Sequence, residues 1–217
     1  MITLAEENYL KAILTISLKE NSTISTNSIA HEIGTSPASV SDMLKKLAEK
    51  KFIKYQKYKG VQLNNLGKST AISILRRHRL WETFLVNKLD FNWSQVHEVA
   101  EQLEHIKSSE LIDKLDKFLG FPSFDPHGEP IPTKNGKIPK RNTIALSELK
   151  AGKKGVVMGV NLDEVNFLNY LNKLNIKIGS QIEVIETEIF DQSLTIKIKN
   201  IKHHISNNVA KHLLIKL

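Results

Sequence analysis

Apolar residues recur at helical spacing through the first 120 residues of the chain, in runs separated by Gly, Pro and polar clusters. In residues 6–19, for example, Tyr9, Leu10, Ile13 and Leu14 share one face of a helix. The same periodicity predicts helices over 27–33, from 37 onward, and over 66–88, 93–104 and 109–119. From residue 144 short apolar alternations predict strands within 155–160, 181–185, 193–198 and 213–215, with a helix inserted over 163–174.

The second and third predicted helices are joined by a short turn that contains Gly34. Glycine adopts the left-handed conformation that a tight helix–helix junction requires. Ser36 is a candidate N-cap of the third helix, Pro37 suits its first position, and Ser25 or Thr26 can cap the second helix. This is the helix-turn-helix pattern, and the alternating residues 52–57 and 60–63 add a predicted hairpin, giving a winged helix-turn-helix.

The charge of this region indicates a polyanionic partner such as DNA. The whole chain carries a net charge of +8. Between residues 45 and 79 the sequence contains eleven Lys and Arg residues and only one acidic residue, Glu49. We expect Ser36, Pro37 and Ser39 to approach DNA bases, because small side chains permit close approach. The residues expected to contact mostly phosphate are Thr26, Lys45, Lys46, Lys57 and Lys59. A winged-helix protein–protein module is the alternative, although such modules normally lack a basic face.

Composition narrows the classes of protein further. With no cysteine, the chain can form neither disulfides nor thiolate metal sites, so any metal ligands are nitrogen and oxygen atoms. No run of eighteen apolar residues is present, and the N-terminus lacks a basic stretch followed by an apolar core. We therefore expect neither a membrane span nor a secretory signal, and the expected location is the cytoplasm.

His and Glu residues on the middle helices are spaced as metal ligands would be. His78 and Glu82 are four residues apart, as are His97 and Glu101, so each pair would share a helical face. Glu101, Glu104 and His105 are related by three and four residues in the same way. Two helices with these sets could hold one or two divalent ions between them. The alternative is a pair of amphipathic helices with solvated charged faces.

The predicted middle helices carry more apolar surface than their mutual packing needs. A homodimer formed through this region would bury the excess. A two-fold dimer would also present two recognition helices to a palindromic double-stranded operator.

At the residues Arg77-His78-Arg79-Leu80, Glu82, Val96-His97-Glu98, Glu101 and Leu103-Glu104-His105, the chain resembles the diphtheria toxin repressor and manganese transport regulator family. The likeness covers nearly the whole chain. It implies a dimeric repressor of metal-uptake genes that is activated by divalent manganese or iron at up to two sites per subunit. The primary site would use Asn8, Glu101, Glu104 and His105. The second would use His78, Glu82 and His97, joined by Asp125, His127 and Asp163, with Glu164 as the alternative to Asp163.

Three positions depart from patterns within that family. Glu101 stands where iron-responsive members place a soft sulfur residue, which favours Mn²⁺ over Fe²⁺. Asn8 stands where members carry Asp or Met, and offers a neutral carbonyl oxygen that Glu7 or water could replace. Lys11 stands where one short manganese-type subgroup has a ligating Glu, so the paired-metal arrangement of that subgroup is not expected here.

The resemblance and the residue pattern together predict a mainly α fold with small β parts. The expected division is a winged helix-turn-helix DNA-binding domain (1–65), a helical dimerisation and metal-binding domain with a linker (66–141), and an SH3-like, or FeoA-like, β-barrel (142–217). A regulator with degenerate metal sites is one alternative. A metal-dependent hydrolase is the other, but no nucleophile or phosphate-binding loop accompanies the cluster, so an enzyme is not expected.

Overall fold

The computed structural model describes residues 2–19, 23–56, 60–162 and 164–217, which form two compact units. The first unit comprises residues up to 78 together with 104–107 and 132–137. The second unit comprises residues 79–103, 108–131 and 138–217. Among the described residues, no helix combines the length and the apolar character needed to span a membrane.

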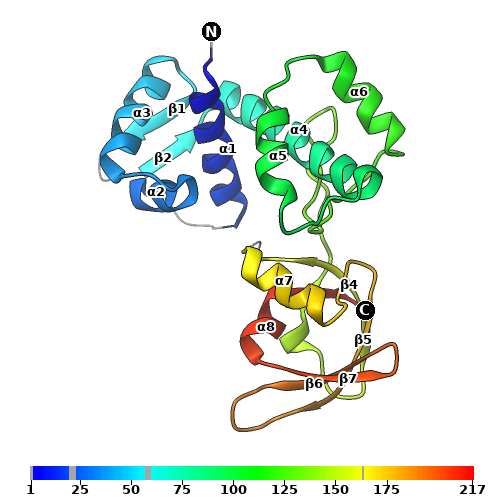
Figure 1. Ribbon diagram of the computed structural model, residues 1–217. Helices are drawn as coiled ribbons and strands as arrows, with labels where there is room; N and C mark the ends of the chain where they lie inside the picture. Colours follow the sequence, from blue (N-terminus) through cyan, green and yellow to red (C-terminus); the bar gives the residue numbers. More distant parts are fainter. Residues whose placement is uncertain (1, 20–22, 57–59, 163) are drawn as a thin grey trace. The chain divides into compact units, whose positions relative to one another are not determined.

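The first unit contains three helices followed by a hairpin (Figure 1). The helices are α1 (Leu4–Lys19), α2 (Thr26–Ile33) and α3 (Pro37–Glu49), and the antiparallel strands are β1 (Ile53–Gln56) and β2 (Gly60–Leu63). The predicted helix-turn-helix and the two strands of the wing are therefore confirmed. Residues 57–59, which include the predicted phosphate contacts Lys57 and Lys59, lie outside the described residues.

Capping residues fix the turn between α2 and α3. The Ser25 side chain accepts a hydrogen bond from the Ser28 N–H and caps α2, which decides between Ser25 and Thr26. Gly34 ends α2 with φ of +71°, and its N–H donates to the carbonyl groups of Ala30 and His31. Ser36 then caps α3 and Pro37 occupies its first turn, as the sequence predicts.

Helix α1 combines an apolar face with a buried polar stripe. Leu10 and Ile13 are completely buried in the core of the first unit, together with Leu44 of α3. Glu7 and Lys11, one turn apart on α1, are also buried, with 2% and 9% of their surface exposed. Because buried charges require partners, this stripe must meet polar groups from another segment.

Three further helices follow: α4 (Asn65–Leu89), α5 (Val96–Leu103) and α6 (Ser109–Phe118), and α4 contributes residues to both units. Helix α5 is shorter than the predicted 93–104. Asn92 stabilises a turn that precedes α5. Its carbonyl oxygen accepts a hydrogen bond from the Gln95 N–H, and its side-chain oxygen accepts one from the Ser94 N–H. Because α5 ends at Leu103, Glu104 and His105 do not continue its helical face.

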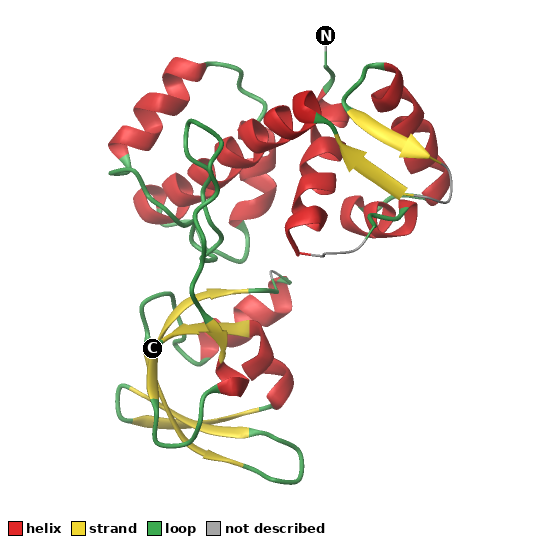
Figure 2. Cartoon of the chain, turned by 180° about the vertical axis from the view of Figure 1, so that it is seen from behind, coloured by secondary structure: helices red, strands yellow, loops and turns green. Residues whose placement is uncertain are grey.

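The C-terminal part of the second unit is a six-stranded antiparallel sheet with helices α7 (Val165–Lys173) and α8 (Asn207–His212) (Figure 2). The strand order is β3-β8-β4-β5-β6-β7. The bounds are β3 (Ile144–Ala145), β4 (Lys154–Val160), β5 (Gln181–Thr187), β6 (Leu194–Ile198), β7 (Ile201–Ile205) and β8 (Leu213–Lys216), with a short 3-10 helix η1 (Leu146–Glu148). The predicted strands are confirmed, but β3 and β7 were not predicted as strands.

Trp93 joins the helical part of the second unit to this sheet domain. Its side chain is buried in the same apolar cluster as Leu168 and Leu171 of α7, and its indole N–H donates to Asn172 Oδ1 at 2.8 Å. The carbonyl group of His127 accepts a hydrogen bond from Val160 N–H of β4 at 2.9 Å. The loop that carries His127 is therefore held by the sheet domain.

Candidate functional site

One buried polar cluster is centred on Glu104, immediately after α5. The Glu104 side chain has no exposed surface, and its Oε2 accepts a hydrogen bond from Lys11 Nζ of α1 at 2.8 Å. The same oxygen lies 2.5 Å from His78 Nδ1 of α4. Burial alone would raise the pKa of Glu104, but the His78 hydrogen bond and the Lys11 charge outweigh it and lower that pKa. Glu104 is therefore an anion without any metal.

Glu7 and His105 form the second half of this cluster. His105 Nδ1 lies 2.7 Å from Glu7 Oε2, so the imidazole N–H at Nδ1 donates to the carboxylate. The other nitrogen, Nε2, then carries a lone pair, and it lies 3.9 Å from Glu104 Oε1. Two ligand atoms at this separation can share one ion, because the bonds of a divalent metal to nitrogen or oxygen are about 2.1 Å.

Two oxygen atoms of this cluster lack hydrogen-bond donors. Among the described residues, no donor reaches Glu104 Oε1 or Asn8 Oδ1, although both atoms are buried. Asn8 and Lys11 are three residues apart on α1, so Asn8 shares the face that meets Glu104. A buried acceptor without a partner is costly unless a cation or water satisfies it. We refer to Asn8, Glu104 and His105 as the Glu104 centre; its residues fit a divalent cation.

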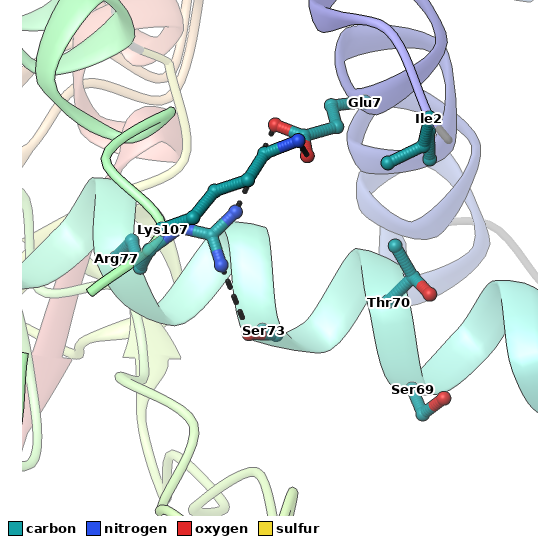
Figure 3. A pocket seen from close by; sticks show the side chains of 7 residues that line it. All are labelled: Ile2, Glu7, Ser69, Thr70, Ser73, Arg77 and Lys107. Carbon is teal, nitrogen blue, oxygen red and sulfur yellow. Dashed lines mark hydrogen bonds and ion pairs between the residues drawn. The ribbon is translucent and has the colours of Figure 1, made fainter. Parts of the chain in front are cut away.

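A pocket of about 300 Å³ opens beside Glu7 (Figure 3). Arg77 and Lys107 converge on the Glu7 carboxylate, with N–O distances of 3.8 Å and 3.2 Å. Arg77 also donates to Ser73 Oγ at 3.1 Å. The remaining residues that line the pocket are Ile2, Ser69 and Thr70. The two cations neutralise Glu7, which lets it orient His105 without adding a free negative charge.

A second buried cluster lies entirely in the second unit. Glu82, Asp125 and His127 each offer one ligand atom, and these atoms lie within 4.8 Å of one another. His97 Nδ1 adds a nitrogen 3.3 Å from Glu82 Oε1. Glu82, Asp125 and His127 are buried, whereas the His97 side chain is 55% exposed. We refer to these four residues as the Glu82 centre.

The ring of His127 is fixed in orientation by Trp93. His127 Nε2 lies 2.7 Å from the Trp93 carbonyl oxygen, to which it donates, and the two rings are stacked with centroids 5.9 Å apart. Nδ1 is left facing Glu82 Oε2 at 3.8 Å. Burial lowers the pKa of His127, but the hydrogen bond and charge of Glu82 outweigh it and raise the pKa to about 9. Without metal, a proton on His127 therefore balances Glu82 at neutral pH.

Asp125 organises the loop as well as facing the centre. Its Oδ1 accepts hydrogen bonds from the N–H groups of His127 and Glu129, at 2.8 Å and 2.9 Å, and its Oδ2 lies 3.5 Å from Arg79 Nε. Burial, followed by the charge of Glu82, raises the pKa of Asp125 to about 7. One oxygen of Asp125 therefore accepts hydrogen bonds from the backbone of the loop, and the other oxygen lies beside the Arg79 guanidinium.

The other predicted ligands have varied surroundings. Glu101 Oε1 lies 3.6 Å from His97 Nε2, and both side chains are substantially exposed. The expectation that Glu101, Glu104 and His105 share one helical face is wrong, because α5 ends before Glu104. His78 contacts Glu104 through Nδ1, and it also offers one ligand atom within 4.8 Å of ligand atoms of Glu82 and His97, the residues with which it was predicted to form the second site. Asp163 lies outside the described residues, and its neighbour Glu164 precedes α7.

Sequence reasoning missed part of each centre. It did not identify Lys11 as the partner of Glu104, nor Trp93 as the residue that orients His127. The i,i+4 pair of Glu7 and Lys11 within an apolar helix was an available signal. The role of Trp93 had no local signal, since it depends on a backbone carbonyl group and on a loop 34 residues away.

The candidate DNA-contacting surface lies at the start of α3. Ser36, Pro37 and Ser39 are exposed, and Ser36 Oγ accepts from the Ser39 N–H at 3.2 Å. Lys45 and Lys46 are exposed further along α3, and Lys45 Nζ lies 3.1 Å from Asp42. Thr26, the remaining predicted contact among the described residues, is half-buried at the start of α2.

Three family models match the chain along its length. Residues 1–61 match the N-terminal DNA-binding domain of iron-dependent repressors, and residues 64–133 match the metal-binding and dimerisation domain of the same proteins. Residues 144–217 match the FeoA domain.

Individual proteins are similar over comparable spans. The iron-dependent repressor IdeR of Mycobacterium tuberculosis is 30% identical over 165 residues, which cover 73% of this chain and 71% of that protein. A solved structure described as a manganese-dependent transcriptional repressor in complex with manganese is 32% identical, with a TM-score of 0.85 over 97% of this chain and 98% of that chain. A probable metal transport system membrane protein of Chlamydia trachomatis is 43% identical over 75 residues, but this match spans 35% of the chain and 17% of that protein.

Proposed function

Because the chain belongs to the iron-dependent repressor family of metal-dependent transcriptional repressors, we propose that Mn²⁺ activates it as a homodimer that represses metal-uptake genes. Fe²⁺ is the second candidate metal. The observation that carries the proposal is the Glu104 centre, where His105 Nε2 and the unpartnered Glu104 Oε1 lie 3.9 Å apart next to α1. We also propose a cytoplasmic location, because the expected partner is DNA.

The Glu104 centre connects metal binding to the DNA-binding helices. Asn8 lies on α1, whose apolar face packs in the same core as α3. Asn8, Glu104 and His105 would hold one divalent ion, which supplies the positive charge that neutralises Glu104 and satisfies the two unpartnered oxygens. Glu7 orients His105, and Glu104 anchors the turn after α5. Fixing α1 in this way shifts the population toward one arrangement of α3.

The Glu82 centre would hold a second ion through Glu82, His97 and His127, with Asp125 Oδ2 and the predicted ligands His78 and Asp163 completing the set. Trp93 holds the His127 ring in place, and β4 holds the His127 backbone. Metal binding here would therefore rigidify the second unit rather than move α1. The proposed total is two ions per subunit.

The donor atoms favour manganese. Carboxylate and carbonyl oxygens suit Mn²⁺, and the chain has no cysteine that would attract softer metals. Zn²⁺ is expected to bind as well, because histidine nitrogen and carboxylate oxygen are also ligands of Zn²⁺. Selectivity would then reflect metal availability and the coordination geometry of the centre.

The homodimer and its operator are proposed from surface properties. Leu111 and Phe118 of α6 are 38% and 62% exposed, and Phe121 just after it is 66% exposed, so an apolar surface is available for a partner subunit. A symmetric dimer would place two copies of α3 on a palindromic operator. We propose the divisions 1–65, 66–141 and 142–217 as the DNA-binding, dimerisation and FeoA-like domains.

Removing ligands from the Glu104 centre tests this function. We expect His105→Gln to weaken Mn²⁺ binding at least about a hundredfold and to abolish Mn²⁺-activated DNA binding, because a metal ligand is lost while the Lys11–Glu104 pair remains. Glu104→Gln should have the same effect. Isothermal titration with Mn²⁺ and gel-shift titration of the protein's own promoter measure the two effects.

The matched control is Glu110→Gln, which removes an exposed carboxylate paired to Lys114 on α6. It should behave as the unmodified protein does. Mn²⁺-activated DNA binding that survives both His105→Gln and Glu104→Gln would refute the proposed role of this centre.

A further inference from the structure

A small polar network joins helix α7 to the turn that precedes α5. Asn172 uses both groups of its amide, since Oδ1 accepts from the Trp93 indole N–H at 2.8 Å and Nδ2 donates to Asn92 Oδ1 at 3.3 Å. Ser94 Oγ lies 3.1 Å from the Oδ1 atoms of both Asn92 and Asn169. Asn169 and Asn172 are three residues apart and share one face of α7. We refer to Asn92, Ser94, Asn169 and Asn172 as the asparagine clamp.

The clamp accompanies an apolar contact that would hold α7 by itself. The Trp93 side chain packs in one cluster with Leu168 and Leu171 of α7, and Ser94 beside it is also buried. Apolar burial has no preferred direction, so it would hold α7 against the turn in several similar positions. Hydrogen bonds depend on distance and angle, and a connected network of them selects one arrangement. The clamp therefore fixes the orientation of Trp93 as well as docking α7.

Both histidines of the Glu82 centre depend on the turn that the clamp holds. The Trp93 carbonyl oxygen accepts from His127 Nε2 at 2.7 Å, and the two rings are stacked. His97 follows the turn directly, in the first turn of α5, and its Nδ1 lies 3.3 Å from Glu82 Oε1. Asn172 contacts Trp93, and Trp93 in turn contacts His127, so the clamp reaches the centre through a single intervening residue.

We propose that Asn172 and Ser94 are positioning residues of the Glu82 centre, which act on its histidines through Trp93 and the turn before α5. Helix α7 of the sheet domain thereby tunes the affinity of the centre for a divalent ion through residues that are not ligands. Direct partners of metal-bound side chains change metal affinity by about ten- to a hundredfold, and a residue one contact further out should have a smaller effect. This inference rests on the proposed function, because it concerns the second ion.

Mn²⁺ titration in a His105→Gln background isolates the Glu82 centre, because that substitution removes a ligand of the Glu104 centre. In this background, we expect Asn172→Ala and Ser94→Ala each to weaken Mn²⁺ binding about fivefold. Equilibrium dialysis measures the affinity, and thermal unfolding in chelator verifies the fold and records any loss of stability.

Ser193→Ala is the matched control. Ser193 is buried in the same sheet domain, and its Oγ donates to Asp191 Oδ1 at 2.7 Å, so the substitution removes a comparable buried hydroxyl group that contacts no member of the clamp. It should lower the free energy of unfolding as Ser94→Ala does, while the Mn²⁺ affinity stays unchanged. A clamp that only stabilises the fold would give the same affinity in both variants.

A double-mutant cycle tests the path through Trp93. Trp93→Phe keeps the backbone carbonyl group and an aromatic ring but removes the indole N–H that Asn172 accepts. If Asn172 acts through this N–H, adding Asn172→Ala to Trp93→Phe should weaken Mn²⁺ binding much less than it does alone. Additive losses would overturn the proposed path. If Trp93→Phe fails to fold, the single substitutions decide.

The proposal is also overturned if either Asn172→Ala or Ser94→Ala binds Mn²⁺ as tightly as the His105→Gln parent, or if Ser193→Ala weakens binding as much as they do. Failure of the proposed function looks different. If the His105→Gln parent takes up no Mn²⁺, the proposed second ion is refuted and this inference with it, whereas a parent that binds Mn²⁺ no more tightly than the clamp variants refutes the inference alone.

Discussion

Two imidazole rings determine how the centres can bind metal, because each presents one nitrogen and uses the other for a neighbouring residue. His105 donates to Glu7 through Nδ1, and His127 donates to the Trp93 carbonyl oxygen through Nε2. The partner fixes both the tautomer and the orientation of the ring. His105 therefore directs Nε2 toward the Glu104 carboxylate, at 3.9 Å, and His127 directs Nδ1 toward the Glu82 carboxylate, at 3.8 Å, where it can bind a metal once its proton is released.

Protons replace metal at the Glu82 centre when the protein is metal-free. Folding raises the pKa of His127 from 6.5 to about 9. The bound proton therefore stabilises the metal-free fold fully below pH 6.5, and this stabilisation is lost as the pH rises through 9. Asp125, whose pKa is raised to about 7, acts in the same direction, so metal-free stability should fall with rising pH.

Metal binding at this centre should release a proton. Near pH 7.5, His127 is protonated and Asp125 is largely ionised, so an ion that binds His127 Nδ1 displaces about one proton. Calorimetric titration with Mn²⁺ in two buffers of different ionisation enthalpy measures this number. His127→Gln should abolish the release, and equal heats in both buffers for the unmodified protein would contradict the assignment of His127.

The residue contacts of both centres were the least predictable feature. Periodicity identified His and Glu positions, but Lys11 and Glu104 are 93 residues apart, and no local pattern pairs them. The predicted face of Glu101, Glu104 and His105 required a helix that continues past Leu103, whereas α5 ends there. Ligand types could be read from the sequence, but ligand pairing depends on tertiary packing.

Most helices and strands were predictable because their signals are local. Ser36 followed by Pro37 marked the start of α3, and Gly34 marked the end of α2. The exceptions are the two-residue strand β3 and strand β7, and the residues of β7 are exposed except for Ile205 and the half-buried His203. Strand β7 is joined to β6 by Lys199 and Asn200, which both have positive φ. Without the glycine typical of such hairpins, the turn left no clear sequence signal.

Substitutions at two helix caps can distinguish an effect on the stability of the fold from an effect on DNA affinity. Ser25 and Ser36 cap α2 and α3 through equivalent hydrogen bonds, to the N–H groups of Ser28 and Ser39. Replacing either by alanine should lower the free energy of unfolding by about 1 kcal/mol. Only Ser36 lies at the proposed base-contacting end of α3, so Ser36→Ala should weaken DNA binding several-fold more than Ser25→Ala.

Chemical denaturation and promoter gel shifts measure these two effects. Equal losses of DNA affinity for the two variants would show that Ser36 acts only as a cap. Alanine preserves the backbone conformation of each turn, so the comparison tests the hydroxyl group alone.

At the scale of the whole molecule, the distribution of charge matches a regulator that binds DNA and metal in different parts. The net charge of +8 is concentrated between residues 45 and 79, whereas the carboxylates of both centres are buried and paired. Lys45 and Lys46 are exposed on α3, where phosphate contacts would make binding strongly dependent on salt. The buried carboxylates do not weaken that positive surface.

Metal dependence of DNA binding is the property that most directly tests this scheme. Fluorescence anisotropy of a labelled fragment of the protein's own promoter, titrated with chelator-stripped protein, measures it with Mn²⁺, Fe²⁺, Zn²⁺ or no metal. We predict that saturating Mn²⁺ raises the affinity at least about tenfold over the chelator sample, equivalent to about 1.4 kcal/mol. Equal affinity in every sample, chelator included, would contradict metal activation and leave the two centres as structural clusters.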